Sequence, residues 1–388
     1  AKDIASFAAA TSRRFCARIC LSINRAIDRI IDPLKQWAEN QRVIRPSCAS
    51  SILPLLATLL ALLLIASPTS AQTTGQTTLD KAGQAVTETA QKAADVASET
   101  AQKAADVAQT KFHQDPIFWS YVILSIAAIA CLLAFDIARP GSLERAGKRS
   151  IPNVPAYVWI ACAVMCFLAM TLSQVGALEL PLNLKLGDTN PRNVALLTLF
   201  GFLGGTLTAI VLARLLSIAE PGAGLTITQR CFVQGSLGAL LTFPIVALIG
   251  ALMSMLHAAM GGNVQQLGHA TLQSLSDNPS SVWPWVSVAS AVILAPIFEE
   301  LLFRGMLQTA ILRAFARPWL AILLTSALFA AMHAIGGINM PWYAIAGIFV
   351  LSIGLGVAFE RTKRVGVPII MHVLFNAANV AITLLVSR

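Results

Sequence analysis

The stretch 284–312, PWVSVASAVILAPIFEELLFRGMLQTAIL, places three charged side chains inside an otherwise uncharged, largely apolar run. Glu299, Glu300 and Arg304 are those charges. The run is longer than the roughly 20 apolar residues that a transmembrane helix needs. Charge inside a bilayer is costly and is kept mainly at functional sites, so these side chains are the first place to look for chemistry.

The composition of the whole chain agrees with a membrane location. Of its 388 residues 56% are hydrophobic and 12% are charged, whereas an ordinary soluble domain is about 25% charged. A chain of this size with so little charge cannot cover its own surface with polar groups. This excludes a soluble globular enzyme and favours a polytopic membrane protein.

The apolar runs predict an all-α fold, a polytopic transmembrane helix bundle of about eight spans. We expect the spans at 117–138, 154–173, 193–216, 231–257, 284–312, 318–335, 341–359 and 366–387.

Five regions follow from the changes in composition. Residues 1–50 are a basic leader, and 51–71 have the basic flank, apolar core and small residues of a signal peptide, with an uncleaved anchor as the alternative. Residues 72–115 form an alanine-rich helical segment, in which Glu88–Ala97 recurs eleven residues later. We expect N-terminal membrane helices over 116–283 and the chemistry-bearing domain over 284–388.

The positive charge indicates orientation rather than a nucleic-acid partner. Residues 1–49 hold nine Lys or Arg and four Asp or Glu, and so supply +5 of the net +9. The loops 139–149 and 361–364 are basic, and short basic loops face the cytoplasm. Counting spans from either loop places 72–115 outside, in agreement with a signal peptide. The sequence thus predicts a multi-pass protein of the cell inner membrane, in contact with lipid and with no nucleic acid.

The two glutamates are expected to differ in role. Glu300 and Arg304 are four residues apart on one helix face and can form an ion pair. Glu299 is rotated by about 100° and has no local partner, and such a carboxylate suits general-base work. A buried structural salt bridge among all three is the alternative, although one glutamate would suffice for it.

Polar side chains also interrupt two later spans. His333 lies one turn after Phe329, and His372 shares a helix face with Asn376. A lone histidine in an apolar helix is usually a core residue. Two histidines, each on its own span after the Glu-Glu-Arg span, argue against a coincidence. A tilt or a kink near Pro296 would let the three spans bring these groups together near mid-membrane.

Three motifs in this order, Glu-Glu-x-x-x-Arg, Phe-x-x-x-His and His-x-x-x-Asn on separate spans, resemble those of the CPBP family. That family comprises the type II CAAX-prenyl endopeptidases and their bacterial Abi relatives. The resemblance covers about 284–388, and each motif is complete: Glu299, Glu300 and Arg304; Phe329 and His333; His372 and Asn376.

The resemblance implies intramembrane proteolysis of a membrane-associated peptide or protein by activated water. Glu299 would activate the water, and His333 would hold or polarise it. His372 and Asn376 would donate to the developing oxyanion, while Glu300 would assist or orient Arg304.

A metal is a second way to activate the water. The resemblance points to zinc, for which Glu299, His333 and His372 are the candidate ligands. The His-Glu-x-x-His signature of ordinary zinc proteases is absent from the sequence. Direct glutamate catalysis and a metal-bound water therefore both remain open.

Two other functions fit the same residues. A non-catalytic scaffold or bacteriocin-immunity protein would keep the motifs as structural pairs. A proton-coupled transporter would use the four ionisable groups as a relay, although the two halves of the membrane region show no sequence symmetry of the kind that transporters often carry. Prenylated CAAX substrates are expected only for the eukaryotic branch of the family.

Overall fold

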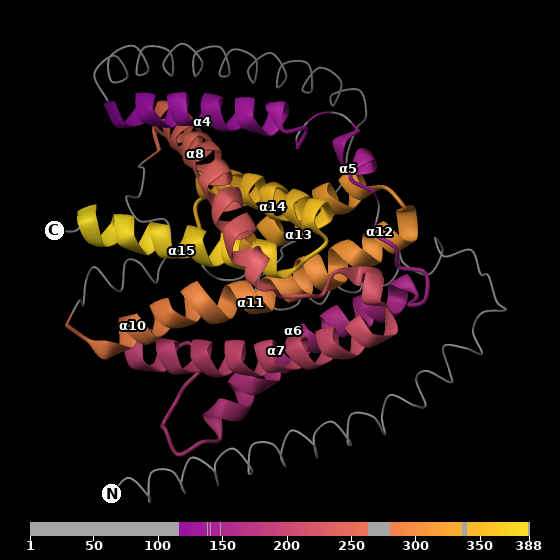
Figure 1. Ribbon diagram of the computed structural model, residues 1–388. Helices are drawn as coiled ribbons and strands as arrows, with labels where there is room; N and C mark the ends of the chain where they lie inside the picture. The colour runs from indigo at the N-terminus through magenta and orange to yellow at the C-terminus, as the bar shows by residue number, and fades with distance from the viewer. Residues whose placement is uncertain are drawn as a thin grey trace, which may run out of the picture.

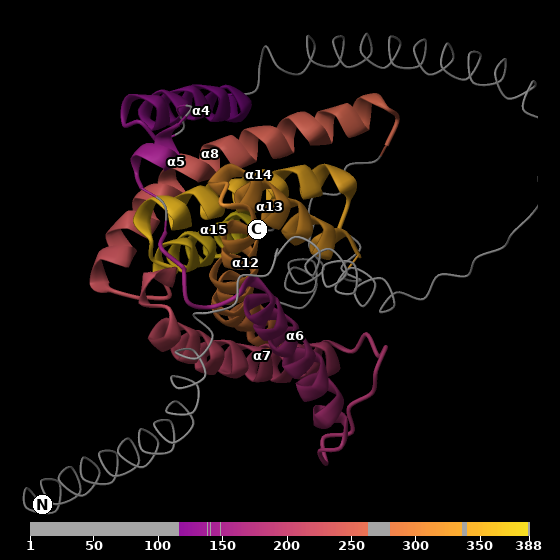
Figure 2. The same ribbon diagram turned by 90° about the vertical axis from the view of Figure 1, so that its right-hand side faces the viewer.

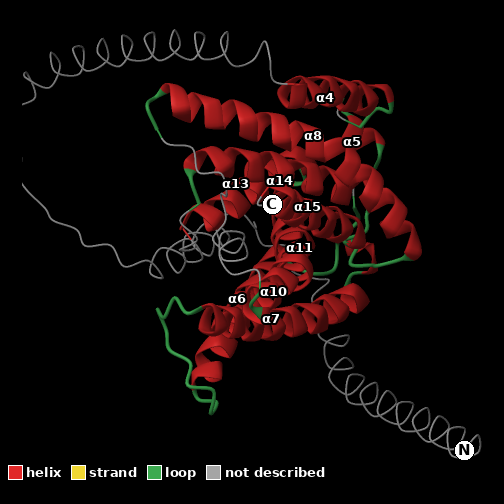
Figure 3. Cartoon of the chain, turned by 90° about the vertical axis from the view of Figure 1, so that its left-hand side faces the viewer, coloured by secondary structure: helices red, strands yellow, loops and turns green. Residues whose placement is uncertain are grey.

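The computed structural model describes residues 116–137, 139, 141–147, 149–262, 280–335 and 340–386. Within this part of the chain every regular element is a helix (Figure 3), which confirms the all-α prediction. The predicted leader (1–50), the signal peptide or anchor (51–71) and the alanine-rich repeat (72–115) lie outside the described residues.

The helices, in chain order, are α4 (Pro116–Ala134), α5 (Ser142–Arg145), α6 (Ala156–Leu178), α7 (Pro191–Ala219), the 3₁₀ turn η2 (Pro221–Ala223), α8 (Gln229–Ala259), α10 (Val282–Ala289), η3 (Ser290–Leu294), α11 (Ala295–Glu300), η4 (Leu301–Gln308), α12 (Thr309–Phe315), α13 (Pro318–Ile335), α14 (Trp342–Thr362) and α15 (Gly366–Val386). Among the described residues eight stretches are long and apolar enough to cross a membrane, and each overlaps one of the eight predicted spans.

The span Val282–Phe315, built from α10, η3, α11, η4 and α12, lies at the centre of the bundle. It runs between α7 on one side and α15 on the other (Figure 1). Within the most apolar 18-residue stretch of this span 56% of the residues are buried, whereas 11% are buried in the corresponding stretches of α4 and of α8. Its charged residues are therefore surrounded by protein rather than by lipid.

This central span is not a regular α-helix. Two stretches, η3 and η4, are π-helical and enclose the short α11 that ends at Glu300. Pro296 falls in the first turn of α11, which continues without a break from η3, so the missing N–H of the proline leaves one carbonyl of η3 without a helical donor. π-helical turns are rare and often occur at functional sites.

The loops at one end of the bundle are bonded to one another. The N–H of Val365 donates to the Gly224 carbonyl at 2.8 Å, and Arg361 donates to the Asp136 carbonyl at 2.9 Å. Arg313 reaches the Pro152 carbonyl at 3.2 Å. The basic loops that the sequence places on one side of the membrane thus meet at one end of the structure.

Close helix contacts hold the remaining spans against this centre. α7 packs against α6, and α8 packs against α4, α14 and α15 (Figure 2). A Cβ atom at Gly205 of α7 would lie 2.8 Å from the Phe298 ring. Glycine at this position lets α7 approach the residue that precedes Glu299.

Candidate active site

The predicted ion pair within the central span is present and fully buried. Arg304 Nη1 donates to Glu300 Oε1 at 2.9 Å, and both side chains are 0% exposed. Arg304 Nη2 donates to Ser352 Oγ of α14 at 2.7 Å. The arginine is therefore fixed from two helices and neutralises the charge of Glu300 inside the bundle.

His372 binds the same carboxylate oxygen as the arginine. Its Nδ1 lies 2.8 Å from Glu300 Oε1. An ionised carboxylate can only accept hydrogen bonds, so we assign the Nδ1 proton of His372 as the donor. In the neutral imidazole this tautomer leaves the Nε2 lone pair free to accept.

Glu299 lies on the other side of this imidazole. His372 Nε2 is 3.8 Å from Glu299 Oε2, which is too long for a direct hydrogen bond. The Glu299 side chain is 16% exposed, whereas that of Glu300 is 0% exposed. Glu299 thus faces a residue of α15 rather than one of its own helix, and it is the more accessible of the two glutamates.

Phe329 connects the two histidines of the motifs. Its ring centroid lies 4.6 Å from that of His333 and 5.8 Å from that of His372. The Arg304 guanidinium lies 4.6 Å from the same ring, within the range of a cation–π contact. Phe329 is buried, so it sets the positions of three polar groups at once.

His333 and Asn376 bond to backbone rather than to the carboxylates. His333 Nδ1 lies 2.9 Å from the Phe329 carbonyl of its own helix. Asn376 Nδ2 donates to the Ala291 carbonyl at 2.9 Å, which ties α15 to η3. The structure therefore brings His372 directly to the glutamates, places His333 beyond Phe329, and uses Asn376 to join the two helices.

Only part of the predicted zinc ligand set is assembled. Glu299 and His372 are neighbours, whereas His333 turns Nδ1 to a carbonyl. In the part of the chain that the structure describes, no three His, Cys, Asp or Glu side chains form a group that could hold a metal ion. The residues as they stand do not fit a three-ligand zinc site, so zinc stays a prediction.

A second buried network begins two turns further along the central span. Gln308 Nε2 donates to Glu360 Oε1 at 2.8 Å. Glu360 also accepts from Arg149, at 3.0 Å from Nε and 2.7 Å from Nη2. Arg149 Nη1 donates to Thr309 Oγ1 at 2.8 Å. The sequence does not predict this network, because Arg149 lies in a basic loop whose charge indicates membrane orientation. The position of Gln308, eight residues after Glu300 and so on its helix face, was the available signal.

The comparisons with known proteins concern the same C-terminal region. Residues 281–378 match the family model described as type II CAAX prenyl endopeptidase Rce1-like. UPF0177 protein YbdI of Lactococcus lactis subsp. lactis (strain IL1403) is 33% identical over 92 residues, which are 24% of this chain and 46% of that relative. UPF0177 protein YaiH of the same strain is 36% identical over 97 residues, which are 25% of this chain and 37% of that relative.

The chain thus spans less than half the length of either of these relatives. No solved structure matches it significantly. The matched region contains all three motifs. Residues 281–378 of this multi-pass membrane protein are thus similar to the type II CAAX prenyl endopeptidases, which confirms the resemblance to the CPBP family that the three motifs indicate.

Proposed function

We propose that the chain is an intramembrane endopeptidase of the bacterial inner membrane, which hydrolyses a peptide bond in a membrane-associated substrate. The observation that carries this proposal is the position of His372, whose imidazole lies between two carboxylates of one helix. One carboxylate, Glu300, holds Nδ1 at 2.8 Å, and the other, Glu299, lies 3.8 Å from Nε2.

The geometry supports a role for Glu299 as general base. Nε2 of neutral His372 and Oε2 of Glu299 are both acceptors, and a separation above 3.5 Å leaves space for a bridging donor. One water molecule could donate a hydrogen bond to each. Arg304 and Glu300 fix the ring of His372, so such a water would be held without further reorganisation.

Hydrolysis then follows with balanced proton transfer. As the water oxygen bonds to the substrate carbonyl carbon, Glu299 takes its proton and the carbonyl oxygen becomes an oxyanion. Collapse of this intermediate breaks the C–N bond, and the proton passes from Glu299 to the leaving amine. In accordance with the family resemblance, we assign an oxyanion contact to Asn376, whose Nδ2 has a second proton to donate, and a water-holding role to His333. The resemblance gives His372 an oxyanion contact as well, which requires the imidazolium form, because Nε2 of the neutral ring accepts from the water instead.

The proposal extends to the region before the matched domain. Residues 51–71 would direct the chain to the membrane as a signal peptide or an anchor. The bonded, basic end of the bundle would face the cytoplasm, because short basic loops are retained there.

Cleavage of a panel of single-span membrane peptides by the purified full chain in liposomes tests this function. Glu299→Gln preserves the shape of the side chain but removes the base, so we expect kcat to fall by about 10²–10⁴-fold while thermal stability is retained. Glu144→Gln, at an exposed glutamate of α5, is the matched control and should cleave normally.

Cleavage that persists in Glu299→Gln would exclude Glu299 as the base. A scaffold or immunity protein would cleave none of the peptides. Addition of a strong chelator to the same assay addresses zinc: loss of cleavage that added zinc restores supports a metal-bound water, and unchanged cleavage supports direct glutamate catalysis.

A further inference from the structure

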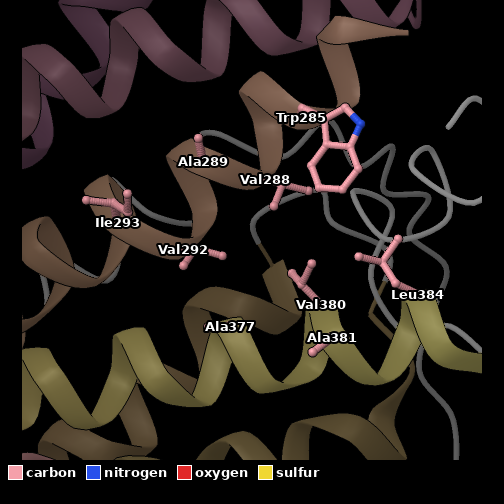
Figure 4. Close-up of a pocket in the computed structure, with 9 residues that line it drawn as sticks. All are labelled: Trp285, Val288, Ala289, Val292, Ile293, Ala377, Val380, Ala381 and Leu384. Carbon is pink, nitrogen blue, oxygen red and sulfur yellow. The ribbon is translucent and has the colours of Figure 1, made fainter. Parts of the chain in front are cut away.

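An apolar groove of about 330 Å³ opens between the central span and α15 (Figure 4). All nine of the residues that line it are apolar: Trp285, Val288, Ala289, Val292 and Ile293 on α10 and η3, and Ala377, Val380, Ala381 and Leu384 on α15. We infer that this groove receives one apolar transmembrane helix of the substrate polypeptide and so presents a neighbouring bond to Glu299. The inference rests on the proposed function.

The groove is continuous with the candidate active site. Its two walls are the helices that carry Glu299 and His372. Ile293 precedes Glu299 by six residues, or about 9 Å along a helix, and Ala377 directly follows Asn376. The hydrogen bond from Asn376 to the Ala291 carbonyl joins the two walls at this end.

The shape of the groove suits a helix. Its α15 wall is formed by positions spaced three and four residues apart, which is one face of that helix. Ala377 and Ala381 are separated by three residues, and a third alanine, Ala289, stands on the opposite wall. Small residues at this spacing let the backbone of a second helix approach closely in a membrane.

The charge distribution argues against an anionic lipid as the occupant. None of the nine lining side chains is charged or could bind a phosphate. Arg313 and Arg361 bond to loops at the opposite end of the bundle. At the near end the Arg192 guanidinium lies 5.7 Å from the centroid of the Trp283 ring, which is not part of the groove lining. An uncharged polypeptide segment needs no charged partner within the groove, and the phospholipid adduct in the test below distinguishes it from a lipid acyl chain.

Site-specific photocrosslinking tests the occupant without requiring cleavage. A photoreactive benzoylphenylalanine replaces Leu384, a large side chain of the groove lining, in the full-length Glu299→Gln protein, in vesicles of phosphatidylethanolamine and phosphatidylglycerol that contain a biotinylated single-span Leu/Ala peptide. Leu385, the adjacent residue and 73% exposed, is the matched control position. We expect several-fold more peptide adduct at position 384 than at position 385.

Equal peptide yields at the two positions would overturn the inference. So would a predominant adduct to phospholipid, or to another segment of the chain itself, at position 384. Each of these results identifies a different occupant of the groove or none.

Steady-state kinetics of cleavage distinguish failure of the groove inference from failure of the proposed hydrolysis. With Glu299 intact, Ala381→Phe fills the groove and should raise the KM for the peptide about tenfold or more, with kcat little changed. Ile382→Phe should alter neither constant. Normal KM in Ala381→Phe overturns the groove inference and leaves hydrolysis standing. Peptide adduct at position 384 without any cleavage by the protein with Glu299 intact overturns hydrolysis and leaves the groove inference standing.

Discussion

At the scale of single residues, one carboxylate oxygen organises the candidate site. Glu300 Oε1 accepts from Arg304 at 2.9 Å and lies 2.8 Å from His372 Nδ1. The oxygen therefore receives one donor from its own helix and one from α15. Because both contacts are buried, removal of either partner would leave a charge or a polar group unpaired.

The substitution His372→Asn tests the roles of the two imidazole nitrogens separately. The asparagine amide stands close to the place of Nδ1 and can still donate to Glu300, but nothing replaces Nε2. We expect the variant to fold and its cleavage rate to fall by about 10²–10⁴-fold. His372→Ala, which loses both contacts, should also lower the melting temperature. A His372→Asn protein that is folded and fully active would exclude Nε2 from the reaction.

The sequence predicts some of these residue-level contacts and not others. The Glu300–Arg304 pair follows from a separation of four residues on a helix, and it is present. The contact of His372 with Glu300 depends on how α15 is rotated against α11, which local spacing does not specify. The bond from Asn376 to a backbone carbonyl is unpredictable for the same reason.

At the scale of helices, the central span is positioned by close contact with α7. Phe298 precedes Glu299, is buried, and packs edge to face on Phe202 with ring centroids 6.0 Å apart. Gly205 lies beneath the same phenyl ring. The orientation of Glu299 therefore depends on a helix outside the matched family region.

Gly205→Leu should push Phe298 away and disturb Glu299. Overpacking of a well-packed interior typically costs about 1–3 kcal/mol, so we expect a lower melting temperature in detergent together with reduced cleavage. The control is Gly176→Leu on α6, where an added Cβ meets nothing within 4 Å. Equal stability of the two variants would show that α7 does not constrain Phe298.

Hydropathy predicts the number and the positions of the helices well, because each span must be apolar over most of its length. It does not predict that α10, α11 and α12 alternate with the π-helical η3 and η4. In a π-helical turn each N–H bonds to the carbonyl five residues earlier instead of four. Packing around the central span determines which of the two bonds forms. The three-residue turn η2 and the four-residue α5 are too short to give a periodic signal.

At the scale of the whole molecule, one ion pair joins the N-terminal region to the family domain. Arg149, before α6, is paired with Glu360 of α14, and their side chains are 0% and 4% exposed. The Arg149 guanidinium also lies 4.2 Å from the centroid of the Phe359 ring. The matched region is therefore completed by a residue about 130 positions before its start.

Arg149→Met should destabilise the protein strongly, since removing one partner of a buried pair typically costs about 3–5 kcal/mol. The double variant Arg149→Met with Glu360→Met should recover much of this loss, because neither charge is then left buried alone. Arg145→Met is the control, since the pair of Arg145 with Asp136 is exposed at 54% and 36%. Thermal unfolding in detergent measures all three, and a double variant no more stable than Arg149→Met would contradict the pairing argument.

The π-helical stretch Leu301–Gln308 limits how the central span can change in length. Removing one residue from it while the π winding is kept would still leave the span long enough for the bilayer. Every side chain beyond the deletion would, however, swing by roughly a quarter turn around the axis. Gln308 and Thr309 would then turn away from Glu360 and Arg149, while Glu299 stayed in place. The number of residues between the two buried networks is therefore tied to the winding of this stretch, and it can change by one only where a π-helical turn becomes an α-helical one.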